Sequence, residues 1–210
     1  MTRAEVPADT RTDADPADAA DTADRARLLA EGVRWREEGR LEDALARMLG
    51  LSARYPDDGT VAYQTAWIHD RMGLEDAAVP HYRRALESGR LSPEDRLGAL
   101  TGCGSTLRAL GRYEEAAELL TAATAEFPDD GALRAFLAMT LHNLGRSGEA
   151  VTLLLRLLAA SSTAPNIPAY RKAIEYYAQD LDRVDPSEFS PCESGEVAHP
   201  PERGELEPEP

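Results

Sequence analysis

Apolar and polar residues recur with helical spacing over residues 97–130, and the pattern predicts two helices joined at a glycine. In the first helix, apolar residues stand three or four positions apart until Gly111 interrupts the run. The second helix starts near Tyr113 and ends at Phe127-Pro128. Each helix carries one apolar stripe, which a single hairpin cannot bury. The pattern therefore predicts a helical hairpin that packs against further hairpins.

The same unit recurs along the chain with a period of about 34 residues. Each unit has a glycine at the turn and an alanine five residues later. The glycines are Gly39, Gly73, Gly111 and Gly145, and the alanines are Ala44, Ala78, Ala116 and Ala150. A small residue also stands seven positions before each glycine, where the second helix is expected to cross the first. Four repeats are predicted, over residues 25–58, 59–92, 97–130 and 131–164.

This period, with its small residues at fixed positions, resembles the tetratricopeptide repeat (TPR). More narrowly, the chain is similar to a bacterial TPR group, the group 5 domain family. The similar segments are AWIHDRMG at 66–73, VPHYRRAL at 79–86, LGRYEEA at 110–116, FLAMTLHNLG at 136–145 and YAQDLD at 177–182. The resemblance implies an all-α fold, a right-handed α-solenoid of four TPR hairpins, in a cytoplasmic protein whose family supplies no catalytic residues.

Segments at both ends of the repeats have other patterns. Residues 168–184 carry one apolar stripe and are predicted to form a C-terminal capping helix, because a solenoid needs a terminal unit with a polar outer face. Residues 1–24 and 185–210 contain very few large apolar side chains and many acids. Such segments cannot offset the entropy of ordering, so both are expected to be disordered acidic tails.

The formal charge of −15 belongs mostly to these tails. Residues 1–24 carry a net charge of −5 and residues 185–210 one of −7, which leaves −3 for residues 25–184. There is no basic stripe, so we expect no nucleic-acid partner. No apolar stretch approaches the length of a membrane span, and the two cysteines do not suggest a disulfide framework. These features favour a cytoplasmic protein with no membrane partner.

Catalytic constellations are not evident in the sequence. The four histidines show no spacing typical of metal ligands, and Cys103 falls on a face predicted to be packed. His69 occupies a position where TPR repeats usually have tyrosine, which favours a buried, hydrogen-bonded histidine. The acids Asp57-Asp58 and Asp129-Asp130 precede helix starts and are expected to be structural. We therefore predict no enzyme activity, no metal and no cofactor.

Function in TPR proteins resides on the concave surface, which the first helix of each hairpin lines. By analogy with the family, the residues predicted to contact a partner are Tyr63, Trp67, Arg71, Arg108, Met139, His142 and Asn143. Aromatic residues and arginine dominate binding hot spots. The alternative that Tyr63 and Trp67 only pack between neighbouring helices stays open.

Two functions are compatible with this sequence. The leading hypothesis is a non-catalytic protein-protein interaction module that binds a peptide or a partner segment in the concave groove. The alternative is a self-associating structural or scaffold protein that uses its terminal repeats and forms a weak homo-oligomer. The identity of a partner does not follow from the sequence.

Overall fold

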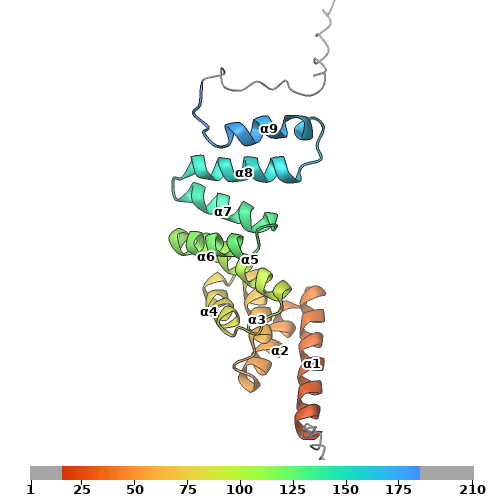
Figure 1. The fold of residues 1–210 in the computed structure, drawn as a ribbon. Helices are drawn as coiled ribbons and strands as arrows, with labels where there is room; N and C mark the ends of the chain where they lie inside the picture. The colour runs from red at the N-terminus through yellow and green to blue at the C-terminus, as the bar shows by residue number, and fades with distance from the viewer. Residues whose placement is uncertain (1–15, 185–210) are drawn as a thin grey trace, which may run out of the picture.

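The computed structural model describes residues 16–184, and within this range the chain forms nine helices and no strand (Figure 1). The helices are α1 (Pro16–Glu37), α2 (Leu41–Arg54), α3 (Gly59–Arg71), α4 (Glu75–Glu87), α5 (Pro93–Ala109), α6 (Tyr113–Glu126), α7 (Gly131–Asn143), α8 (Ser147–Ser161) and α9 (Ile167–Tyr177). Apart from residues 16–24, the two expected tails lie outside the described residues.

Each helix packs against the next along the chain, so that α1 to α8 form four hairpins and α9 follows them. We call α1, α3, α5 and α7 the A helices, and α2, α4, α6 and α8 the B helices. The A helices also touch one another in sequence, from α1 to α3, α5 and α7. The described chain is therefore an α-solenoid of helical hairpins, as the repeat pattern predicts.

Every hairpin turns at the predicted glycine. Gly39, Gly73, Gly111 and Gly145 adopt φ values between 71° and 80°. Glycine reaches this left-handed region without the steric cost that a Cβ imposes, and it therefore ends the A helix at a defined residue.

Polar side chains cap the N-termini of several helices. Asp58 accepts hydrogen bonds from two amides in the first turn of α3, and Asp130 accepts one from the Leu133 amide at 2.7 Å. The Ser92 hydroxyl accepts the Asp95 amide at 3.0 Å at the start of α5. These bonds satisfy amides that have no partner within the helix. The structural role predicted for the acid pairs is thus confirmed for the second acid of each pair.

Small side chains let the A and B helices cross closely. The four alanines predicted at the crossings are buried: Ala44, Ala78, Ala116 and Ala150. On the A-helix side, a Cβ added to Gly104 would lie 2.5 Å from Cδ2 of the buried Leu120. The repeat phase assigned from the sequence therefore agrees with the packing.

The N-terminal boundary differs from the expected one. Helix α1 begins at Pro16, so residues 16–24 are helical and the boundary expected at residue 24 is corrected. This segment lacks large apolar residues, but it is rich in alanine, the best helix former, and proline suits a first helical turn. Two of its acids, Asp21 and Asp24, also bond Arg54 of α2.

The C-terminal helix is shorter than expected. Helix α9 ends at Tyr177, whereas the sequence pattern extended it to residue 184. Beyond it, the Asp182 amide donates to the Asp180 carboxylate at 3.2 Å, and such side-chain bonds compete with the helical backbone. Leu181 and Val184 are 41% and 94% exposed, so the predicted apolar stripe does not continue to its expected end.

Candidate functional site

Tyr63 and Trp67 stand one turn apart on α3, and their rings stack with centroids 5.9 Å apart. Tyr63 is only 7% exposed, and it lies against α5 so closely that Gly98 has no room for a side chain. Tyr63 thus packs between neighbouring A helices, as the alternative interpretation allowed. Trp67 remains partly exposed and is the member of the pair that a ligand can reach.

Arg36 of α1 covers the ring of Trp67. Its Cζ lies 3.6 Å from the ring centroid, which is cation–π geometry. The guanidinium donates hydrogen bonds to Gln64 and, at 3.2 Å, to Glu37, and the residue is 6% exposed. Burial lowers the pKa of Arg36 and nearby Arg71 acts in the same direction, whereas Glu37 opposes them. The guanidinium still carries its charge, because arginine is not deprotonated in proteins.

The other predicted site residues form a second set on α5 and α7. Arg108 donates to the Asn143 side-chain oxygen at 3.2 Å, and its Nε is buried with no hydrogen-bond partner. Met139 is 40% exposed, and exposed His142 lies 3.1 Å from the Ser147 hydroxyl. The structure therefore brings the predicted residues together as two sets, one around Trp67 and one around Arg108.

Arg71 extends the first set by one further turn of α3. It is exposed, and its side chain makes no hydrogen bond or ion pair within residues 16–184. Residue Arg36, in contrast, was absent from the predicted site. Its position in the first repeat predicted that it faces the same A-helix surface. Nothing in the neighbouring sequence indicated that it contacts Trp67, which lies 31 residues later.

Two histidines, His69 and His81, and Cys103 have structural positions. His69 is 8% exposed and its Nδ1 lies 3.0 Å from the Thr65 carbonyl, which confirms the predicted buried histidine. Its ring stacks on His81, with centroids 5.2 Å apart. Burial, together with nearby Arg84 and His69, lowers the pKa of His81 to about 4. Burial raises the pKa of Cys103 to about 11, so this thiol is a poor nucleophile.

Two further features, a cluster of metal ligands and a membrane-spanning helix, are absent from residues 16–184. Over residues 16–184, no three histidine, cysteine or acidic side chains gather in a way that could hold a metal ion. In the same range, no helix is both long and apolar enough to cross a membrane.

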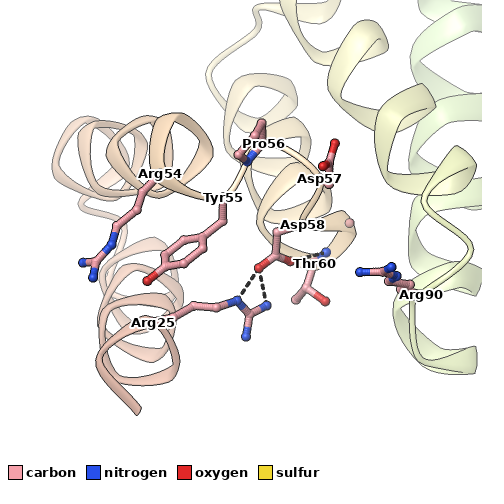
Figure 2. Close-up of a pocket in the computed structure, with 9 residues that line it drawn as sticks. Arg25, Arg54, Tyr55, Pro56, Asp57, Asp58, Thr60 and Arg90 are labelled. Atoms are coloured by element: carbon pink, nitrogen blue, oxygen red, sulfur yellow. Dashed lines mark hydrogen bonds and ion pairs between the residues drawn. The ribbon is translucent and has the colours of Figure 1, made fainter. Parts of the chain in front are cut away.

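A cavity of about 480 Å³ lies where α1 and α2 meet the start of α3 (Figure 2). Arg25 pairs there with Asp58, the acid that caps α3, and Arg90 lies across the cavity from them. Burial raises the pKa of Asp58, but the bonds from Arg25 and the helix amides outweigh it and lower the pKa overall. Arg25 and Asp58 bind each other, and this pair holds the start of α3 in place.

A family model for the tetratrico peptide repeat matches residues 59–181. The chain belongs to this family. The match covers the second, third and fourth hairpins and extends past α9. No curated protein matches the chain at a significant level.

Solved structures of TPR proteins share the fold. The chain superimposes on MamA of Desulfovibrio magneticus RS-1, from residue 41 to its end, with a TM-score of 0.57 and 20% identity, covering 75% of this chain and 90% of that one. PilF of Pseudomonas aeruginosa gives a TM-score of 0.56 and 18% identity, covering 74% and 69%. At this identity the likeness concerns the fold alone, and the family and fold together indicate a protein-interaction or scaffold role.

Proposed function

We propose that the surface of the A helices is a concave groove that binds a peptide or a segment of a partner protein, without catalysis, and that Trp67 is its main apolar contact. One observation carries this proposal: a partly exposed tryptophan is held between two ordered side chains of the A helices. Tyr63 stacks on its ring and Arg36 covers it at 3.6 Å. A rigid aromatic loses little conformational entropy on binding, which makes it an effective anchor.

Charge around Trp67 favours an acidic ligand. The Arg36 guanidinium on the ring is already paired with Glu37, so the charge open to a ligand is that of exposed Arg71, which stands one turn away without an ion-pair partner in residues 16–184. Arginine binds carboxylates through two parallel hydrogen bonds. The chemistry of this surface therefore suits a segment in which a large apolar side chain stands beside a carboxylate.

The set on α5 and α7 would extend the groove. The bond between Arg108 and Asn143 lies on the surface of the molecule, and both side chains can exchange it for bonds to a ligand backbone. Met139 and His142, both exposed, would then contact the next part of the segment.

Peptides selected from a random library on the full chain would test this proposal. We expect the selected peptides to combine an apolar residue with neighbouring acids. Trp67→Ala should weaken their binding by about 2 kcal/mol, or roughly thirtyfold, in fluorescence polarisation. Arg71→Glu should also weaken it, and increasingly so as salt is lowered.

The matched control is Arg90→Glu, which makes the same charge change beside the opposite end of α3, at the cavity of Figure 2. This variant should bind the selected peptides like the wild type. If the peptides bind Trp67→Ala with full affinity, the ligand surface does not include the A-helix aromatic and the proposal fails.

A further inference from the structure

Apolar side chains of α8 are exposed at positions that are buried in other B helices. Leu154 is 43% exposed. The residues at the same position of the first three repeats are exposed by 0%, 1% and 0%: Met48, Tyr82 and Leu120. Val151, also on α8, is 44% exposed, although two of its counterparts, Val79 and Ala117, are buried. The face of α8 that should receive the next repeat is therefore open.

The cause is the position of α9. Ala159 of α8 is fully buried and its carbonyl accepts a 2.7 Å hydrogen bond from Arg171 of α9. The counterparts of Ala159 in the first three repeats are exposed: Ala53, Glu87 and Ala125. Among the described helices, each A helix touches the previous A helix, whereas α9 touches α8 and not α7. Helix α9 thus packs on a different side of α8 from the side that an A helix would occupy.

The connection before α9 explains this displacement. Helices α3 and α7 each follow a Pro-Asp-Asp-Gly motif, whose second acid caps the helix. Before α9 the chain reads Pro165-Asn166, and Asn166 takes a left-handed conformation with φ 69° and makes no side-chain cap. The turn at Pro165-Asn166 therefore differs from the turns before α3 and α7, and it places α9 on a different side of α8.

Four side chains form one apolar surface, which we call the α8–α9 patch: Val151, Leu154, Leu158 and Tyr170, each 40–54% exposed. A cavity on the other flank of both helices is lined by Leu153 and Arg156 of α8 and by Glu175 of α9. At helical spacing, the patch residues of each helix point away from that cavity. They therefore lie on one common face.

The composition of the molecule indicates what covers this patch. The charged residues of α8, Glu149 and Arg156, line a cavity with residues 179–182, so the part of the patch on α8 is uncharged. Of the ten exposed large apolar residues in the described chain, seven lie in residues 151–184 and none in α1. In the first hairpin, the partly exposed Leu28 and Trp35 line a cavity together with the charged residues Asp43, Arg47 and Arg54, so this end matches an uncharged apolar patch less well. The apolar surface that matches the patch is the same patch on another copy, and uncharged surfaces do not repel each other despite the net charge of the chain.

We propose that two copies of this chain pair through the α8–α9 patch about a two-fold axis, with α8 packed antiparallel against α8 of the partner. Val151, Leu154 and Leu158 are spaced three and four residues apart, as in the seam of a coiled coil. Leu154 is the central residue of α8, so an antiparallel pair places it near the axis, facing its counterpart. This pairing is independent of the ligand surface proposed above.

The size of the patch sets the strength of the dimer. Helices α8 and α9 are about 22 Å and 16 Å long and about 10 Å wide, so their common face covers about half of the roughly 800 Å² per partner that stable interfaces bury. We therefore expect a reversible equilibrium between monomer and dimer, which light scattering and sedimentation velocity of the full chain would detect over about 1–100 μM.

Leu154→Glu should raise the dimer dissociation constant at least tenfold. The matched control is Leu49→Glu, which makes the same change at a 45% exposed leucine of α2 and should leave the dimer intact. In a Cys103→Ser, Cys192→Ser background, Leu154→Cys should form an intermolecular disulfide on oxidation, whereas Leu49→Cys should not. This second measurement does not depend on the fold tolerating a glutamate.

Three results would overturn the proposal. The wild type could remain monomeric up to about 100 μM. Leu154→Glu could dimerise like the wild type. The full chain could be monomeric while a chain ending at Val184 dimerises, which would assign the patch to residues 185–210 of the same molecule.

Discussion

Gly104→Ala tests the close crossing of α5 and α6 on which the repeat assignment depends. Gly104 lies well inside α5, and a Cβ there would meet Cδ2 and Cγ of Leu120 at 2.5 and 2.6 Å. Leu120 is fully buried in the core that α5, α6 and α7 share. Because the core around it is filled, the Leu120 side chain has no space to rotate into, so accommodating the methyl group requires the two helices to separate.

Two effects of opposite sign determine the change in the free energy of unfolding. Replacing glycine by alanine inside a helix stabilises by about 1 kcal/mol. Overpacking a filled core destabilises by about 1–3 kcal/mol. We expect the second effect to exceed the first at Gly104, with a net loss of about 1 kcal/mol.

Gly50→Ala supplies the control for helix propensity. Gly50 lies within α2, is exposed, and has nothing within 4 Å of an added Cβ. This variant should gain about 1 kcal/mol, so the two variants should differ by about 1–3 kcal/mol and have opposite signs.

Urea denaturation followed by circular dichroism at 222 nm would measure both variants in the full chain. Because repeat proteins can unfold in stages, the comparison uses transition midpoints as well as fitted free energies. The loss caused by Leu120→Ala should be smaller in the Gly104→Ala background, since the removed side chain is the one that clashes. Equal stabilisation by Gly104→Ala and Gly50→Ala would show that α5 and α6 do not approach this closely.

Two further predictions concern caps and pH. Asp130→Ala should destabilise the protein by about 1 kcal/mol in thermal melts, because it removes the cap on the Leu133 amide, while Asp129→Ala should cost clearly less. His81, whose folded pKa of about 4 lies below its ordinary value of 6.5, binds fewer protons in the folded state than in the unfolded state between these two pH values. The free energy of unfolding should therefore fall as the pH falls from about 6.5 to about 4. Because His81 is partly exposed, we expect its contribution to be roughly 1–2 kcal/mol, and this contribution should be absent in His81→Gln. An identical pH dependence in both proteins would show that another group is responsible.

The sequence by itself determined the hairpins and their phase, because the features that encode them act locally. A glycine with positive φ ends each A helix wherever the backbone must turn, as Gly111 does between α5 and α6. An acid before a helix start caps it through bonds spanning two or three residues, as Asp58 and Asp130 do. Such features need no distant part of the chain, so pattern and spacing were sufficient to predict them.

The site was only partly visible in the sequence. Helical spacing placed Trp67 on the A-helix face, but its contact with Arg36 joins two repeats and depends on how α1 lies against α3. Likewise, the aromatic pair could be read as ligand-binding or as packing until the position of α5 showed Tyr63 to be buried. Residues 16–24 were expected to be disordered because they contain no large apolar side chain, and the Arg54 guanidinium that donates to Asp21 and Asp24 comes from α2, at least 30 residues later in the sequence.

Leu120 and Leu154 show most directly what only the tertiary structure decided. They occupy the same position of consecutive repeats, and the sequence gives no reason to treat them differently. Leu120 is fully buried and Leu154 is 43% exposed, because α7 covers the first whereas α9 packs on another side of α8. Whether an apolar residue is buried depends on the helix that packs against it as well as on the residue itself. In a solenoid that neighbour comes from the following repeat, and a single turn around Asn166 determines where it lies.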